Sequence, residues 1–98
     1  MKTFNKVYNV LASKYIRRGL NLGDDVAISI QDMFTGDELY YEDCQEVESE
    51  KVLKEFNDMK VYSIDINTEY YEIDEDNYKT LITFNLMNQE QAKHYENK

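Results

Sequence analysis

The sequence contains no proline and no tryptophan, and it has one cysteine, one histidine and three glycines. A single cysteine, Cys44, cannot form an internal disulfide, which excludes small disulfide-stapled scaffolds and favours a reducing compartment. No apolar run approaches the roughly 18 residues of a membrane span, and none of signal-peptide length follows Lys2 and Lys6. We therefore expect a cytoplasmic protein with no membrane partner.

The length of the chain leaves room for one domain, residues 1–98. Its 98 residues include 42% hydrophobic ones, enough for one modest core. Nine tyrosines and four phenylalanines are the largest side chains available, and we expect them to carry that core.

Charge is distributed unevenly along the chain, whose net charge is −9. Residues 1–22 hold five bases and no acid, whereas residues 24–78 hold eighteen acids and three bases, a net charge of −15. Affinity for DNA comes largely from lysine and arginine, so direct binding of nucleic acid is disfavoured. The acidic segment instead favours a basic partner.

The first helix is predicted over residues 3–18, with Thr3 as N-cap and Gly19 as C-cap. Its apolar stripe at helical spacing consists of Phe4, Val7, Tyr8, Leu11 and Tyr15. Bases gather on the other side: Lys2, Lys6, Lys14, Arg17 and Arg18. We expect this basic side to be solvated or to pair with the protein's own acids or a neighbouring subunit; contact with nucleic acid is a weaker alternative.

Period-two alternation over residues 26–31 predicts a half-buried strand, followed by a turn at 35–37 and a return strand over 38–42. Asp43 with Glu46 fits a capping box and Ser49 is a second N-cap candidate, so the next helix is expected to begin between 43 and 50 and to end near Lys60. Its stripe consists of Val52, Leu53, Phe56 and Met59.

A long strand is predicted from Val61 to about Ile73, then a turn at 74–77 and a last strand over 78–87. In the long strand, Tyr62, Ile64 and Ile66 are expected to share one face. The inner face of the last strand is expected to carry Tyr78, Thr80, Ile82, Phe84 and Leu86. The polar tail over 88–98 fits either a short helix or a frayed end.

This order predicts an α+β fold, α-β-β-α-β-β, with one antiparallel sheet of about four strands and the helices on one of its faces. The other face is left to solvent. It would carry Glu38, Glu42, Asp65 and Glu69.

The acidic segments 40–43 and 69–76 are the most informative feature for function. Carboxylates two positions apart on a strand point the same way about 6.6–6.8 Å apart, so strands and a turn can hold a fixed array of charge. Such an array can imitate a phosphate backbone, while neighbouring tyrosines supply flat contact area. A solvated acidic face that keeps the protein soluble fits the same charge run. The candidate partner-binding residues are Glu38, Tyr40, Glu42, Asp43, Asp65, Glu69, Tyr71, Glu72, Asp74, Glu75 and Asp76.

Metal and catalytic sites are not predicted. A calcium loop starting at Asp74 would need glycine at its sixth position, where Lys79 stands. Zinc is excluded because Cys44 and His94, the strong candidate ligands, are far apart in sequence. His94 lies in the polar tail, and acids around Cys44 would raise the pKa of its thiol. We expect no cofactor and no enzyme activity, with Cys44 a small buried hydrophobe.

Short length, lack of proline, an Asn/Tyr/Lys/Asp/Glu-rich composition and the acidic segments 38–43 and 65–76 together resemble, as a type, small acidic inhibitors encoded by phages and mobile elements. That type includes anti-CRISPR proteins, antirestriction proteins and inhibitors of uracil-DNA glycosylase. Several are DNA mimics that occupy the nucleic-acid channel of their target. The resemblance implies the same role here, inside a bacterial host cell.

The leading hypothesis is therefore an inhibitor that binds the basic nucleic-acid site of a DNA-processing enzyme such as a CRISPR nuclease. The alternative is a non-enzymatic adaptor or immunity-like module that recognises a protein partner through shape and aromatic contacts. A third hypothesis is a protein that forms a homodimer through its basic helix.

Overall fold

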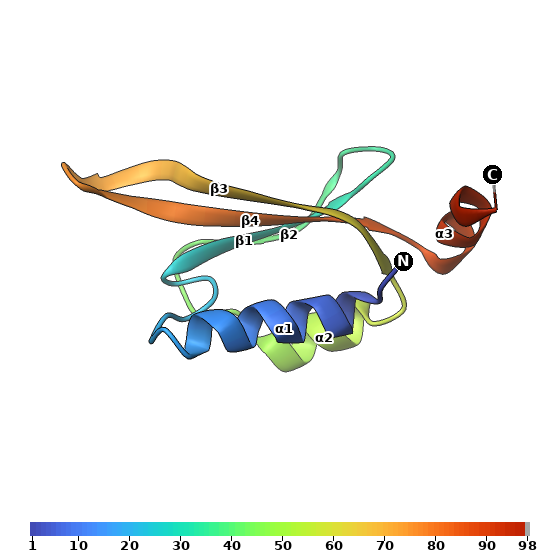
Figure 1. Ribbon diagram of the computed structural model, residues 1–98, viewed down its shortest axis with the longest axis horizontal. Helices are drawn as coiled ribbons and strands as arrows, with labels where there is room; N and C mark the ends of the chain where they lie inside the picture. Colours follow the sequence, from blue (N-terminus) through green and yellow to red (C-terminus); the bar gives the residue numbers. More distant parts are fainter. Residues whose placement is uncertain (98) are drawn as a thin grey trace.

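The computed structural model describes residues 1–97, and its three helices and four-stranded sheet confirm the α+β class (Figure 1). The prediction for residues 88–98 includes Lys98, which lies outside the described part. In chain order the elements are α1 Phe4–Ile16, β1 Val26–Asp32, β2 Glu38–Glu42, α2 Ser49–Phe56, β3 Lys60–Asp74, β4 Asn77–Met87 and α3 Gln89–Glu96.

The sheet is mixed, and the prediction of a purely antiparallel sheet is wrong. Its strand order is β2-β1-β4-β3, and the two central strands, β1 and β4, run parallel. Each hairpin is antiparallel by itself, β1 with β2 and β3 with β4. The segment containing α2 carries the chain from one edge of the sheet to the other, so the inner strands of the two hairpins become neighbours with the same direction.

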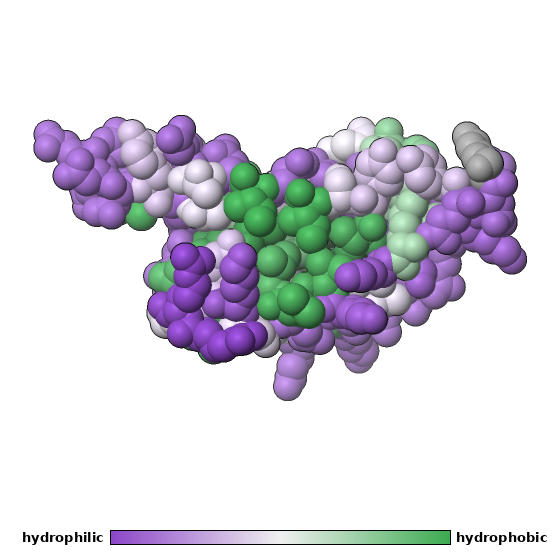
Figure 2. Space-filling view, viewed as in Figure 1, coloured by the Kyte–Doolittle hydropathy of each residue, from purple (hydrophilic) through white to green (hydrophobic). Residues whose placement is uncertain are grey.

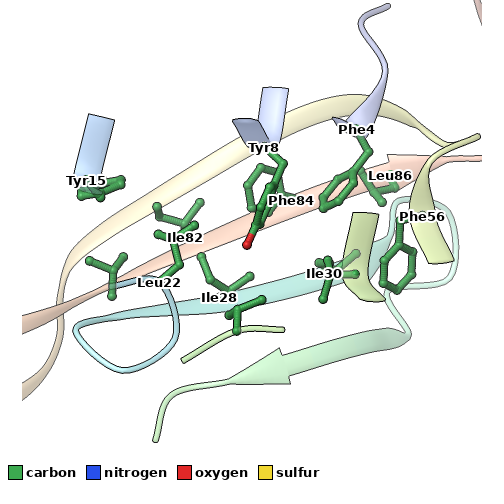
Figure 3. Close-up of a cluster of buried hydrophobic side chains, with 13 residues drawn as sticks. Phe4, Tyr8, Tyr15, Leu22, Ile28, Ile30, Phe56, Ile82, Phe84 and Leu86 are labelled. Atoms are coloured by element: carbon green, nitrogen blue, oxygen red, sulfur yellow. The ribbon is translucent and has the colours of Figure 1, made fainter. Parts of the chain in front are cut away.

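Helices α1 and α2 cover one face of the sheet, as expected, and α3 lies beyond its end (Figure 1). We call the face under α1 and α2 the helix face and the opposite one the open face. On the helix face, Phe4 packs against Phe84 with ring centroids 5.3 Å apart and an interplanar angle of 73° (Figure 3). Edge-to-face contacts of this kind add about 0.5–1.5 kcal/mol to the burial itself. The prediction that the aromatics carry the core holds for five of the thirteen, and the other members of the core are aliphatic. The aromatic members are Phe4, Tyr8, Tyr15, Phe56 and Phe84.

The buried hydroxyl of Tyr8 has a partner. It lies 2.8 Å from Oγ of Ser49, at the start of α2, so the buried oxygen is satisfied and the two helices are joined. Burial raises the pKa of the Tyr8 hydroxyl, which keeps the phenol neutral.

Strand β1 is buried on both faces, which corrects the prediction of a half-buried strand. Ala27 and Ser29 alternate with the core residues Ile28 and Ile30, yet they are buried as completely. A polar residue at every second position of a strand predicts an exposed face only if no other part of the protein covers that face. A central strand can be covered on both of its faces.

Gly19 terminates α1 as predicted, although the helix ends at Ile16 and does not reach residue 18. Helix α2 begins within the expected interval of residues 43–50 but later than the capping box indicated. Gly19 has a φ of 78° and the backbone N–H of Leu20 donates to the carbonyl of Tyr15 at 3.0 Å, a Schellman ending. Helix α2 runs from Ser49 to Phe56, so it does not reach Lys60. Its N-cap is Glu48, so both predicted N-caps, Asp43 and Ser49, are wrong. The carboxylate of Asp43 instead accepts the hydroxyl of Tyr41 and the thiol of Cys44.

A shift in register near the start of β3 changes which side chains reach the core. The pairing shifts between Val61 and Ser63, so Val61, and not Tyr62, lies with Ile64 against the core. Tyr62 instead packs on Tyr95 of α3, with ring centroids 5.4 Å apart. One extra residue in a strand reverses the side-chain alternation, which explains why the predicted stripe of Tyr62, Ile64 and Ile66 is wrong at Tyr62.

The far end of the β3–β4 hairpin projects beyond the rest of the sheet. Strand β1 pairs with β4 only from Thr80 onward, so residues 68–79, which we call the arm, form a two-stranded extension (Figure 1). The molecule is correspondingly elongated, 47 × 23 × 18 Å. Tyr78, predicted on the inner face, is therefore 50% exposed, because it lies past the helices.

Candidate partner-binding surface

The arm concentrates exposed negative charge at one end of the molecule. Five exposed acids lie within its twelve residues, with Lys79 as the single base. The acids, all among the predicted site residues, are Glu69, Glu72, Asp74, Glu75 and Asp76. The structure therefore brings together the larger acidic segment identified in the sequence.

The acids of the arm are not neutralised by the protein itself. Within residues 1–97 the ion pairs are those of the N-terminal amine with Glu96 and of Lys51 with Glu48. The bases of α1 therefore form no ion pair with the arm in the described part of the chain. The charge of the arm remains available to a partner.

Hydrogen bonds fix the turn at the tip of the arm. Oδ1 of Asp74 accepts the backbone N–H of Asp76 at 3.2 Å and the side-chain amide of Asn77 at 2.9 Å. The Asn77 amide, followed by the Asp76 backbone, lowers the pKa of Asp74. The carboxylate is thus ionised at neutral pH and held in one orientation, as an ordered acidic array requires.

A tyrosine pair joins the base of the arm to the opposite edge of the sheet. The hydroxyl of Tyr41 in β2 contacts that of Tyr70 in β3 and donates to the carboxylate of Asp43 at 3.0 Å, so Tyr70 is the donor to Tyr41. Tyr41 pairs with Ser29 and so points to the open face. Because β1 and β4 lie between β2 and β3, the contact spans both central strands.

The charges within this network are held in defined states. Burial, followed by the Tyr70 contact, raises the pKa of Tyr41, whereas hydrogen bonds from Cys44 and then Tyr41 lower the pKa of Asp43. Tyr41 is therefore a neutral donor and Asp43 an ionised acceptor over a wide pH range.

Lys79 adds a second link at the base of the arm. Only 4% of its surface is exposed, and its ammonium donates to the backbone carbonyl of Asp43 and lies 5.6 Å from the ring centroid of Tyr71. A buried cation with these partners fixes the arm relative to β2. In the sequence, Lys79 differs from the glycine that a calcium loop requires, and its position as the lone base among the acids of the arm is the signal that could have singled it out.

The remaining predicted site residues do not join the arm. Glu42 pairs with Ile28 and Tyr40 with Ile30, both core residues, so Glu42 and Tyr40 point to the helix face, and the prediction of Glu42 on the open face is wrong. Asp65 pairs with Thr83 on the open face and accepts the Asn85 amide at 2.9 Å.

Glu38 lies at the far end of β2, next to Gln31. Because β2 and β3 form opposite edges of the sheet, the predicted set divides. Tyr71 and the five acids lie on the arm, Asp43 lies at its base, and Glu38, Tyr40, Glu42 and Asp65 lie elsewhere.

The cluster of Glu42, Asp43 and Cys44 could be taken for a metal site, since one ligand atom of each lies within 4.8 Å of the others. Its acceptors are occupied. Oδ1 of Asp43 accepts the Cys44 thiol at 2.9 Å, and Glu42 accepts the Cys44 backbone N–H at 3.1 Å. Asp43 raises the pKa of the thiol, as the sequence predicted, which makes sulfur a poor ligand. Cys44 is exposed, so the prediction that it is buried is wrong.

His94 lies on α3 and is exposed, beside a hollow that Phe34 and Tyr95 also line.

Within residues 1–97, every helix falls short of the length and apolar character that a membrane span requires. No protein-family model, no curated protein and no solved structure matches the chain.

Proposed function

We propose that this protein is an inhibitor that inserts its acidic arm into the basic nucleic-acid site of a DNA-processing enzyme. The observation that carries the proposal is the projecting arm, whose five exposed acids have no internal ion-pair partner within residues 1–97. A narrow, two-stranded extension can enter a groove that a whole domain cannot. Its charge would draw it to lysine and arginine side chains that otherwise bind phosphate.

The links at the base of the arm support this proposal. Because the Tyr41–Tyr70 contact and the buried Lys79 hold the arm against the sheet, less conformational entropy is lost when a partner binds. A CRISPR nuclease is the target that the resemblance to phage inhibitors implies. Its guide–target channel has the required positive charge.

The test is amide substitution of the arm. The arm variant carries five changes: Glu69→Gln, Glu72→Gln, Asp74→Asn, Glu75→Gln and Asp76→Asn. The control variant removes the same charge from exposed acids elsewhere whose side chains make no hydrogen bond within residues 1–97: Asp24→Asn, Asp37→Asn, Glu46→Gln, Glu55→Gln and Asp58→Asn.

Partners are captured from a bacterial lysate with and without competing duplex DNA, and displacement of labelled DNA from the captured enzyme is then measured with purified components. We expect the wild type and the control variant to displace DNA at similar concentrations, and the arm variant to need at least tenfold more. Equal displacement by the arm variant would show that the acidic array is incidental.

Ionic strength separates this function from an adaptor that recognises its partner through aromatic contacts. The Debye length shortens from about 30 Å at 0.01 M salt to about 10 Å at 0.1 M, so binding by an exposed acidic arm should weaken steeply over that range. An interface centred on tyrosines would retain its affinity. A flat salt dependence would favour the adaptor.

A further inference from the structure

A groove of about 600 Å³ lies between the arm and the end of α1. The arm contributes Ile73, Asp74 and Tyr78, and the body contributes Tyr15, Arg18 and Asp25. In Figure 2 the outline of the molecule is indented beneath the projecting arm. The volume falls within the range of pockets that bind small molecules.

The groove exposes apolar surface on an otherwise charged element. Ile73 is 62% exposed and Tyr78 is 50% exposed, although both belong to the acidic arm. Covering such surface is favourable by about 25 cal/mol per Å², and a tyrosine at the edge of a groove is a common anchor of binding energy. These side chains are therefore suited to contact with a partner.

The polar groups of the groove define which side chain fits. Asp74 and Asp25 supply carboxylates that also accept hydrogen bonds within the protein: both oxygens of Asp74 accept the Asn77 amide, and Oδ2 of Asp25 accepts the backbone N–H of Asn21 at 2.7 Å. Oδ2 of Asp74 and Oδ1 of Asp25 each keep a lone pair for a partner. A guanidinium group carries several N–H donors in a planar fork, so it can donate to two separate carboxylates and stack on an aromatic ring, whereas a compact ammonium does not stack in this way. The combination of carboxylate, ring and aliphatic wall matches arginine.

We propose that this groove binds an arginine side chain of the partner, with Asp74 and Asp25 as acceptors and the ring of Tyr78 as the stacking surface. The inference rests on the proposed function, because it assumes a partner rich in basic residues. It adds a specific contact to what would otherwise be general charge attraction.

Substitution of Arg18 tests whether the ligand of the groove is a cation or an anion. Its guanidinium carbon lies 5.8 Å from the ring centroid of Tyr15, so that ring is already covered and Tyr78 is the more exposed one. A cationic ligand is repelled by Arg18 and attracted by Asp74. An anionic ligand shows the reverse dependence.

The experiment is an NMR titration of the full-length ¹⁵N-labelled protein with N-acetyl-arginine methylamide, with N-acetyl-lysine methylamide and with inorganic phosphate as separate probes. We expect the arginine probe to shift amide signals of residues 73–78 in a saturable manner and the lysine probe to bind several-fold more weakly. Asp74→Asn should weaken arginine binding at least fivefold, while Arg18→Gln leaves it unchanged or tighter.

Glu75→Gln is the matched control, since it removes one charge from the same turn but lies outside the groove; it should alter arginine binding less than twofold. Absence of saturable shifts with the arginine probe would overturn the inference. Binding of phosphate that Arg18→Gln abolishes and Asp74→Asn does not would also overturn it, in favour of an anion site.

A double variant separates this inference from the proposed function. Ile73→Ser with Tyr78→Ser removes the groove's apolar walls and keeps all five acids. If this variant loses the arginine probe and also binds the captured enzyme at least fivefold more weakly, the groove contributes to recognition. If it loses the probe but binds the enzyme as the wild type does, the groove is no part of recognition and the arm proposal stands. Signal dispersion in the same spectra reports whether each variant is folded.

Discussion

Two glycines with the same kind of backbone conformation differ in what surrounds them. Gly23 has a φ of 94° and Gly36 a φ of 75°, both in the left-handed region. A Cβ added at Gly23 would lie 2.2 Å from the carbonyl oxygen of Gln45, whereas a Cβ at Gly36 would meet nothing within 4 Å. The buried turn before β1 thus depends on the absence of a side chain.

We predict that Gly36→Ala lowers the free energy of unfolding by about 1 kcal/mol, the cost of a left-handed alanine. Gly23→Ala should cost about 1–3 kcal/mol more, because backbone must also move to relieve the clash. Urea unfolding followed by circular dichroism measures both. Equal losses would mean that the loop around Gln45 yields without cost.

At the scale of elements, the arm is the part most dependent on long-range links. A two-stranded hairpin alone is marginally stable in water. Here it is held by the Tyr70–Tyr41 contact and by the ammonium of Lys79 on the carbonyl of Asp43. The rigidity of the arm is therefore expected to depend on side chains at its base.

We predict that Tyr70→Phe increases hydrogen exchange of the arm amides over residues 71–79 by about two- to tenfold, since one buried hydrogen bond contributes about 0.5–1.5 kcal/mol. The amides of β1 should be unaffected. Tyr95→Phe is the control, because it removes another tyrosine–tyrosine contact, the one with Tyr62 at the opposite end of β3. Unchanged exchange in the Tyr70 variant would show that Lys79 alone holds the arm.

At the scale of the whole molecule, charge is separated between the basic helix α1 and the acidic arm. With a net charge of −9 and no ion pair to the arm acids within residues 1–97, the arm acts as a source of self-repulsion. Such an excess of unpaired negative charge is expected of a surface that serves binding although it lowers stability.

We predict that a four-amide arm variant that keeps Asp74, with Glu69→Gln, Glu72→Gln, Glu75→Gln and Asp76→Asn, is at least as stable as the wild type, with a gain at low salt that shrinks as salt screens the charges. Urea unfolding at about 0.01 M and 1 M salt, where the Debye lengths are about 30 Å and 3 Å, measures the difference. A four-amide variant less stable than wild type at low salt would show that these four acids, and not Asp74 alone, have a structural role.

Features with a local physical cause could be predicted from the sequence. Strand β2 has the predicted bounds, Gly19 ends α1 and Gly36 adopts the predicted positive φ, because turn chemistry and side-chain period act over a few residues. The acidic array of the arm was likewise visible as a charge run. In contrast, Lys79 and the tyrosine pair were not identified as links, since their partners lie 36 and 29 residues away.

The sequence by itself determined the α+β class, the aromatic side chains that α1 places in the core and the acidic composition of the β3–β4 hairpin. Only the tertiary structure decided that β1 and β4 are parallel neighbours, that Glu42 points to the helix face, and that the acidic hairpin extends past β1 as an arm. The physical reason is that strand pairing and register are set by which apolar faces meet. Those contacts join residues far apart in the chain, and the local period of either strand does not specify its partner.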